Sequence, residues 1–358
     1  IDMLSAYSAL NQGHNHPKLA DAIRKQLDTL TLTSRAFHND QMGPFLKKLT
    51  QITGFDKALP MNTGAEAVET ALKTARRWGY EVKGVEANKA EIIVCQENFH
   101  GRTTTIIGFS TDPLCQDGFG PFTPGFKIIP FDDAQALEDA ITANTVAFLV
   151  EPIQGEAGVK IPSTGYLKKC RDITEKNNVL LIADEIQTGL GRTGKMFCFE
   201  HDGIKPDIVT IGKALGGGYY PVSGILASHE LMEAAFKPGN HGSTFGGNPL
   251  GSAVASAALD VIIDEGLVQK SAEMGAYFKE QLQAMNSPLI KAVRGRGLLI
   301  AIDLTEAAGK ARKYTEALMK SGVLAKETHE TIIRFAPPLV ITKEDIDWAI
   351  EKIKTVLG

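Results

Sequence analysis

Two charged residues, Asp184 and Lys213, each follow a short apolar stretch that has the composition of a buried strand. Asp184 comes after Leu180–Ala183, and Lys213 comes after Ile208–Gly212. Because ligands of open α/β sheets gather at the carboxyl ends of the strands, we expect both side chains at one edge of a sheet. A desolvated lysine is a neutral amine that attacks an aldehyde, and an acid keeps a pyridine nitrogen protonated. The pair therefore predicts imine chemistry on a pyridine cofactor, although either residue alone also fits a structural ion pair.

A turn of small residues, Asn62–Ala65, precedes a segment of helical periodicity, Ala65–Trp78. The first N–H groups of a helix have no partner within it and lie at the positive end of its dipole. Gly64 and Ala65 are therefore candidates for binding a phosphate. The alternative interpretation is that Thr63 is an ordinary helix cap and that the turn binds nothing.

Further polar and aromatic residues follow other predicted strands or lie within them. Phe99 and Arg102 come after one strand, and Glu156 comes after another. Phe99 is a candidate for stacking on a flat ring, although a lone phenylalanine is more often part of the core. Arg102 and Arg334 are candidate carboxylate receptors, because a guanidinium binds a carboxylate through two hydrogen bonds. Arg334 lies inside the apolar stretch Ile332–Phe335, and the alternative for both arginines is a salt-bridged surface residue.

A competing motif lies in Gly189–Lys195, which fits the pattern G-x-x-x-x-G-K of nucleotide-binding loops. The residue after Lys195 is Met196, where such a loop needs a serine or threonine hydroxyl for Mg²⁺. The segment also does not directly follow a strand. We therefore interpret it as a glycine-rich turn.

Short apolar stretches alternate with helical periodicity over most of the chain, which is typical of a mostly parallel sheet covered on both faces. We predict an α/β fold of this kind with a smaller α+β domain at the C-terminus. The predicted divisions are an N-terminal remnant at 1–16, a large cofactor-binding domain at 17–264 and a small domain at 265–358. Strands are predicted at 58–61, 91–95, 127–130, 146–150, 179–183, 208–211, 224–227, 297–303 and 332–335.

Composition excludes several classes of protein. A net charge of −4 gives no electrostatic reason to expect nucleic acid or an anionic membrane as a partner, and no apolar run is long enough to span a membrane. The four cysteines are far apart, which argues against a disulfide framework, and we expect no metal site. We expect a cytoplasmic protein, with the mitochondrial matrix as the alternative. The chain begins at Ile1, within a stretch that we interpret as a strand, and we expect that a preceding segment is missing.

Taken together, these motifs resemble the class III (subgroup II) aminotransferases of fold type I. The matching stretches are Tyr7–His14, Asn62–Glu66, Glu151–Gly158, Ala183–Gly189, Gly212–Ala214, His241–Pro249 and Arg334–Pro338. The resemblance implies pyridoxal 5′-phosphate as the cofactor, held as a Schiff base on Lys213. Lys213 would also move the proton during the reaction, and Asp184 would pair with the pyridine nitrogen. It further implies a homodimer with shared active sites.

The resemblance also implies roles for the other candidates. Gln187 would contact the ring hydroxyl, and Phe99 would stack on the ring. Gly64 and Ala65 would hold the phosphate, joined by Thr244 of the partner subunit. Arg334 would bind the α-carboxylate of 2-oxoglutarate or glutamate, Glu156 would screen that arginine, and Arg102 would bind the remaining carboxylate.

Tyr7 and the run Thr31–Phe37 favour the branch of this family that acts on ornithine. The predicted reaction is ping-pong transfer of the δ-amino group of L-ornithine to 2-oxoglutarate, which gives glutamate 5-semialdehyde and glutamate. N-acetylornithine and then 4-aminobutyrate are the alternative amino donors, and a non-catalytic cofactor-binding protein is the alternative of another class. Two features depart from the family pattern. The N-terminal segment that supplies a tyrosine to the substrate carboxylate is absent, and His100 replaces an aromatic residue of the animal enzymes.

Overall fold

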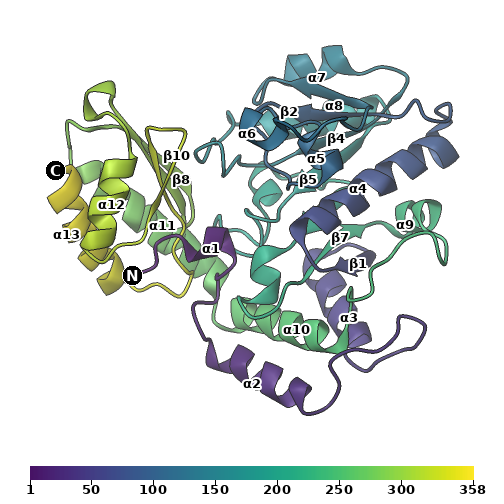
Figure 1. Cartoon of the computed structure of the whole chain (residues 1–358), viewed down its shortest axis with the longest axis horizontal. Coiled ribbons are helices and arrows are strands. Elements are labelled where there is room, and N and C mark those ends of the chain that lie inside the picture. Colours follow the sequence, from purple (N-terminus) through teal and green to yellow (C-terminus); the bar gives the residue numbers. More distant parts are fainter.

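A seven-stranded sheet forms the centre of the larger unit in the computed structural model, which describes residues 1–358 (Figure 1). The strand order is β1-β7-β6-β5-β4-β2-β3, and only β7 runs antiparallel to its neighbours. The mostly parallel sheet that the sequence predicts is therefore confirmed. The strands are β1 (Lys57–Met61), β2 (Glu91–Cys95), β3 (Phe126–Ile129), β4 (Thr145–Val150), β5 (Leu180–Asp184), β6 (Ile208–Ile211) and β7 (Ser223–Ala227).

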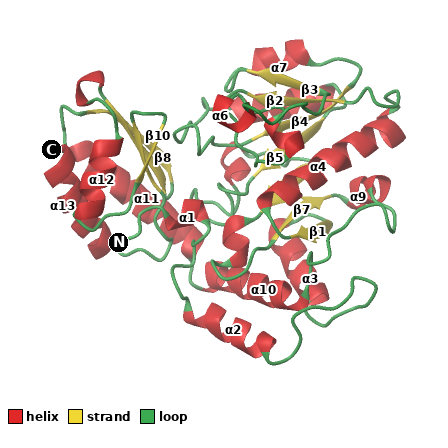
Figure 2. Ribbon diagram, viewed as in Figure 1, coloured by secondary structure: helices red, strands yellow, loops and turns green.

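Helices cover both faces of this sheet (Figure 2). In β2, Ile92 and Val94 belong to one apolar cluster together with helix α4 (Gly64–Trp78), whereas Ile93 and Cys95 belong to another together with α8 (Tyr166–Lys176). Successive strand residues point to opposite faces, so a strand buried on both sides has no polar alternation. The continuous apolar composition of these strands follows from that position. Also in the larger unit are helices α2 (Pro17–Leu27), α3 (Met42–Thr53), α5 (Thr104–Ile107), α6 (Pro113–Gln116), α7 (Ala134–Ala140), α9 (His229–Ala235) and α10 (Pro249–Asp264).

The C-terminal unit contains a separate four-stranded antiparallel sheet of order β10-β11-β9-β8. In Figure 1 it lies beside the larger unit, at the yellow end of the chain. The boundary predicted at 264–265 falls between α10 and α11, and we keep that division as a proposal. The elements are α11 (Leu267–Ala284), β8 (Ile290–Arg296), β9 (Leu299–Leu304), α12 (Arg312–Lys320), β10 (Lys326–Thr328), β11 (Ile332–Phe335) and α13 (Lys343–Leu357).

The N-terminal segment, residues 1–16, packs on the C-terminal unit and carries one short turn, α1 (Ser5–Ser8). The Met3 N–H donates to the Leu324 carbonyl, and the Met3 carbonyl accepts from the Ala336 N–H. The prediction of a strand at Ile1 is wrong, because only a single bridge joins Asp2 to Leu324. None of the helices in the chain combines the length and apolar character that a membrane span requires.

Candidate active site

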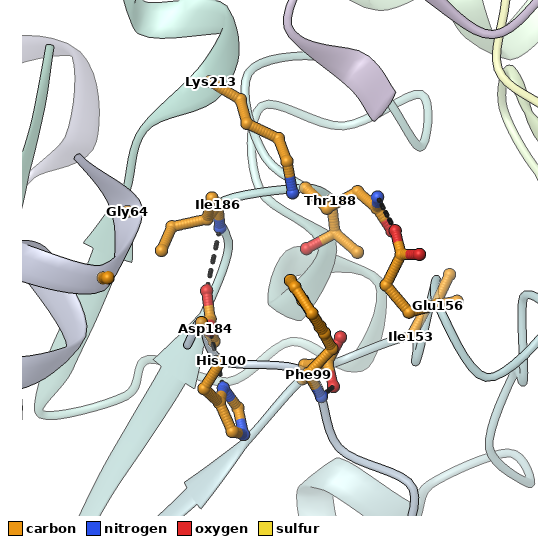
Figure 3. A pocket seen from close by; sticks show the side chains of 13 residues that line it. Gly64, Phe99, His100, Ile153, Glu156, Asp184, Ile186, Thr188 and Lys213 are labelled. Atoms are coloured by element: carbon orange, nitrogen blue, oxygen red, sulfur yellow. Dashed lines mark hydrogen bonds and ion pairs between the residues drawn. The ribbon is translucent and has the colours of Figure 1, made fainter. Parts of the chain in front are cut away.

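One cavity of about 220 Å³ lies at the carboxyl ends of β4 and β5, beside the start of α4. Figure 3 shows side chains from separate elements converging on it. Residues that the sequence predicts at one edge of the sheet thus share a cavity in the structure. Seven predicted residues line the cavity: Gly64, Ala65, Phe99, Glu156, Asp184, Gln187 and Lys213.

Asp184, the last residue of β5, is held in a fixed orientation by three donors. The Thr210 hydroxyl and the Ile186 N–H donate to Oδ1 at 2.9 and 3.1 Å, and His100 Nδ1 lies 2.6 Å from Oδ2. Burial lowers the pKa of His100, but the hydrogen bond and the charge of Asp184 raise it by more, so the net pKa of the imidazole is raised. The three contacts fix the orientation of the Asp184 carboxyl group at the end of β5.

The role of His100 at Asp184 was missed by the sequence analysis. His100 was recorded only as a departure from the family pattern, yet its ring is buried against the key carboxylate. Its position next to Phe99, after a strand that ends at the cavity, was the available signal. Glu151, which follows β4 directly, was missed in the same way, and it also lines the cavity.

Lys213 follows Gly212, just beyond the end of β6, and has a left-handed backbone conformation with φ of 44°. Such a conformation in a non-glycine residue costs free energy and is often found at active sites. Its amine points into the cavity without a hydrogen bond or ion pair to the other residues drawn there (Figure 3). Burial lowers the pKa of the Lys213 amine, and the charges of Asp184 and Glu156 oppose this only in part. The amine is thereby biased toward its neutral, nucleophilic form.

The start of α4 supplies backbone N–H groups to the cavity. Thr63 caps the helix through a reciprocal pair of hydrogen bonds with Glu66, so the interpretation as a helix cap is correct. The cap does not exclude a ligand, because Gly64 and Ala65 still line the cavity at the positive end of the helix dipole. Backbone approach is close here, since a Cβ added to Gly101 would lie 3.1 Å from the Cβ of Ala65.

Phe99 lies in the cavity, and its loop is anchored by Glu151. The Phe99 N–H donates to Glu151 Oε1 at 2.9 Å, and burial raises the pKa of Glu151 to about 7, partly offset by the charge of His100. Arg102 does not line this cavity. Its guanidinium lies 5.6 Å from the centre of the Phe99 ring and borders a neighbouring cavity of about 510 Å³, which shares Phe99 and Glu156 with the first.

Gln187 is packed tightly against Gly155. A Cβ on Gly155 would lie 1.4 Å from Gln187 Oε1, so only glycine leaves room for the amide. Gln187 Nε2 donates to Glu156 Oε1 at 3.2 Å, whereas Gln187 Oε1 is buried without a hydrogen-bond partner. A buried acceptor without a partner costs free energy, which a ligand hydroxyl at that position would recover.

Glu156 and Arg334 form a bidentate ion pair at the wall of the cavity. Arg334 Nη1 donates to Oε1 at 2.8 Å and Nη2 donates to Oε2 at 3.1 Å, and Arg334 is 1% exposed. Burial raises the pKa of Glu156, but the charge of Arg334 and its hydrogen bonds lower it by more, so Glu156 is ionised. On the other side, the guanidinium lies 5.3 Å from the centre of the Tyr7 ring. Tyr7 therefore contacts the site through Arg334 and does not line the inner cavity.

Thr244 lies away from these residues. It borders a surface hollow together with Thr33–Arg35, and its side chain is exposed. Within one chain the structure does not bring Thr244 to the cavity.

The donor set around the cavity fits the cofactor that the sequence predicts. It combines a buried acid, an unpaired amine, helix N–H groups, an aromatic ring and a buried acceptor without a partner. Such a set matches a ring with a basic nitrogen, an aldehyde, a phosphate and a hydroxyl. Seven of the predicted site residues therefore line one cavity, and Arg334 adjoins it through Glu156. Tyr7, Arg102 and Thr244 do not line it.

Comparison with known proteins agrees with this geometry. The chain is 62% identical to the ornithine aminotransferase of Brevibacillus brevis over 357 residues, which is 100% of this chain and 88% of the relative. An ornithine aminotransferase structure from Toxoplasma gondii, described as having partial occupancy of PLP at its active site, superposes with a TM-score of 0.97 at 46% identity. It aligns with 99% of this chain, which covers 84% of that structure.

An acetylornithine aminotransferase structure from Elizabethkingia anophelis superposes with a TM-score of 0.89 at 48% identity, over 99% of this chain and 88% of that one. The family model described as aminotransferase class-III matches residues 1–357. The buried acid, the unpaired amine and these whole-length matches lead to one conclusion: the chain belongs to the class III aminotransferase family.

Proposed function

We propose that this enzyme transfers the δ-amino group of L-ornithine to 2-oxoglutarate by a ping-pong mechanism, giving L-glutamate 5-semialdehyde and L-glutamate. The observation that carries the proposal is the Glu156–Arg334 pair beside Tyr7, at the wall of a cavity that also contains Lys213. An enzyme that accepts both a terminal amine and an α-amino acid needs a carboxylate receptor that is covered in one half-reaction. A paired buried arginine meets that need, whereas a bare one would be costly.

Pyridoxal phosphate, when bound, supplies an aldehyde and an electron-withdrawing ring that stabilises negative charge at the reacting carbon. Lys213 would hold the aldehyde through Nζ and would carry a proton to and from the reacting carbon of the substrate. Asp184, oriented by Thr210 and His100, would keep the ring nitrogen protonated. These roles follow from the unpaired amine and from the three donors on Asp184.

Four other residues would position the cofactor. Gly64 and Ala65 would receive the phosphate at the start of α4. Gln187 would accept the hydrogen bond of the ring hydroxyl at Oε1, which has no partner within the chain. Phe99 would stack on the cofactor ring, and the Arg102 guanidinium would pack against the Phe99 ring.

Substrate orientation would depend on the state of the Glu156–Arg334 pair. While Glu156 covers Arg334, ornithine enters with its δ-amine toward Lys213 and its α-carboxylate away from Arg334. When 2-oxoglutarate enters, its α-carboxylate would displace Glu156 from Arg334, and its second carboxylate would reach Arg102 in the neighbouring cavity. One pocket would then serve two substrates in opposite orientations.

N-acetylornithine is the second candidate amino donor, favoured by the likeness to the acetylornithine aminotransferase structure. The test is a panel of L-ornithine, N-acetylornithine and 4-aminobutyrate on purified enzyme, with each half-reaction followed through the visible absorbance of the bound cofactor. We expect the largest kcat/KM for ornithine. A larger value for N-acetylornithine would transfer the proposal to that substrate, and no visible absorbance would contradict the cofactor assignment.

We also propose a homodimer in which Thr244 of the partner subunit completes the phosphate site. Thr244 and Phe245 are exposed on the surface of one chain, and Phe245 is 46% exposed. Analytical ultracentrifugation should give a dimer, and Thr244→Ala should weaken cofactor binding without changing the mass of the particle. A monomeric active enzyme would contradict the shared site. We propose the cytoplasm as the compartment, since the four cysteines are free thiols, as is typical of reducing compartments.

A further inference from the structure

The turn that carries Tyr7 has an unusual backbone. Ser5, Ala6, Tyr7 and Ser8 have φ of 46°, 47°, 60° and 73°, and none of them is glycine. A left-handed conformation costs such residues about 1–2 kcal/mol each and normally occurs singly. Four in succession therefore require contacts elsewhere that stabilise the turn.

The consequence of this turn is the placement of Tyr7 against Arg334. The Tyr7 ring is 37% exposed, and the Arg334 guanidinium lies 5.3 Å from its centre. Any relaxation of the turn toward right-handed backbone would move the ring away from the carboxylate receptor. The backbone strain thus coincides with a contact that bears on substrate binding.

Arg192 joins the turn to the rest of the molecule. Its Nη2 donates at 3.2 Å to the hydroxyl of Ser5, the first residue of the turn, and at 2.5 Å to Oδ1 of Asn11, which follows the turn. Its Nη1 donates to the carbonyls of Leu298 and Pro337 at 2.9 and 2.6 Å. The second of these carbonyls lies three residues beyond Arg334, so one guanidinium contacts both segments that must meet.

Two further contacts complete the support of the turn. The Ser5 hydroxyl, which accepts from Arg192, donates in turn to the Ala336 carbonyl at 2.6 Å. Asp2 Oδ1 accepts the N–H groups of Leu4 and Ser5, both at 2.9 Å. Asp2 therefore stabilises the start of the turn, and Arg192 contacts the turn through the Ser5 hydroxyl.

None of the hydrogen-bond acceptors of Arg192 is a carboxylate. Arg192 is 0% exposed, and burial lowers its pKa to about 9. Burying an arginine against carbonyl, hydroxyl and amide oxygens is costly, so it needs a function that packing alone does not explain.

We propose that Arg192 is a positioning residue for substrate selection: it holds the left-handed turn Ser5–Ser8 so that Tyr7 lies against Arg334. This inference rests on the proposed function, because it assigns Tyr7 a part in choosing between amino donors. Arg192 acts only through Tyr7 and does not contact the reacting atoms. Its planar fork reaches four acceptors at once, which a lysine ammonium at the same place does not reproduce.

The experiment compares holoenzyme variants in the presence and absence of Tyr7. Arg192→Lys keeps the charge and loses the fork, and Ser5→Ala removes only the hydroxyl between Arg192 and the Ala336 carbonyl. Arg171→Lys is the control, since Arg171 is a partly buried arginine that binds Asp207 and a carbonyl far from the turn. Each change is made in the natural chain and in Tyr7→Ala.

Two measurements are made on each variant. The first is hydrogen exchange of the peptide covering residues 1–12, which needs no substrate. The second is the ratio of kcat/KM for ornithine to kcat/KM for 4-aminobutyrate. We expect Arg192→Lys to speed exchange in residues 1–12 and to lower the ratio about tenfold, with a smaller change of the same sign for Ser5→Ala. In the Tyr7→Ala chain, Arg192→Lys should leave the ratio unchanged.

The proposal is overturned if exchange in residues 1–12 stays at its natural rate, or if Arg192→Lys changes the ratio equally with and without Tyr7. It is also overturned if Arg171→Lys lowers the ratio as much. Should Arg192→Lys fail to fold, Ser5→Ala decides by the same two readouts. Failure of the proposed function is a separate result, because it shows in the natural enzyme as a lack of turnover with ornithine, whatever the exchange of residues 1–12.

Discussion

Replacing Glu156 with glutamine should change which substrate the enzyme prefers, because it alters the cover of Arg334 and little else. Glutamine has nearly the same shape and still accepts one hydrogen bond. It removes the negative charge that accepts two guanidinium hydrogen bonds at 2.8 and 3.1 Å. It also keeps an acceptor for Gln187 Nε2. The variant therefore tests the ion pair without opening a large hole in the cavity wall.

The magnitude follows from the strength of that pair. A hydrogen bond to a charged group contributes about 1.5–3 kcal/mol net, and part of this is retained by the glutamine. Because the Glu156 side chain is 31% exposed, water screens the pair somewhat, and we take the loss as about 2 kcal/mol. At about 1.4 kcal/mol for each factor of ten, this is about thirtyfold. Glutamate would no longer need to displace the carboxylate, so its kcat/KM should rise by about that factor.

The effect on ornithine should have the opposite sign. With Arg334 uncovered, the α-carboxylate of ornithine gains a partner that points its δ-amine away from Lys213. The kcat/KM for ornithine should therefore fall, and the ratio of ornithine to glutamate should fall by more than about thirtyfold. Stopped-flow absorbance of the bound cofactor follows each half-reaction separately. Glu138→Gln, which removes an exposed ion pair with Lys176, is the control. An unchanged ratio, or equal losses for both substrates, would refute the switch.

Three further changes test other parts of the site. Lys213→Ala should abolish turnover while the circular dichroism spectrum stays natural, and any residual cycling would contradict the proton-transfer role. Tyr7→Ile should raise kcat/KM for 4-aminobutyrate relative to ornithine, and a constant ratio would remove Tyr7 from substrate selection. Burial raises the pKa of Glu185 to about 7, so the folded protein keeps a proton that the unfolded chain releases above pH 4.5. The free energy of unfolding should therefore fall by up to about 3 kcal/mol between pH 4.5 and 7 through this group, and Glu185→Gln should flatten that slope in urea titrations.

Much of the fold could be predicted because a strand that is buried on both faces of a sheet consists mostly of apolar residues. The strands at 91–95, 208–211 and 332–335 have the predicted bounds, and apolar residues predominate in each. Helices α2 and α3 were not predicted, and neither were β8 and β10. Strand β8 contains lysine, arginine and glycine, and most of its residues are only partly buried, so its pattern lacks the apolar run.

The candidate site was predictable to the extent that it depends on topology. The rule that ligands gather at the carboxyl ends of parallel strands needs only the position of each strand, and it placed Asp184, Lys213 and Glu156 together. The contacts that orient these residues depend instead on pairs far apart in the chain. His100 and Asp184 are 84 residues apart, and Arg192 and Ser5 are 187 residues apart. The position of His100 after β2 places it near the cavity, but no local pattern identifies the partner in either pair.

The left-handed turn Ser5–Ser8 is another feature that the sequence does not predict. Ser5–Ser8 contains no glycine or asparagine, the residues that usually signal positive φ, so its composition predicts ordinary backbone. The conformation exists only because Asp2, Arg192 and the Ala336 carbonyl meet around it. Residues that prefer negative φ adopt positive φ only where tertiary contacts stabilise that conformation. Tyr7 belongs to this turn and contacts the carboxylate receptor Arg334. The same tertiary contacts therefore account for the strained backbone and for the placement of Tyr7.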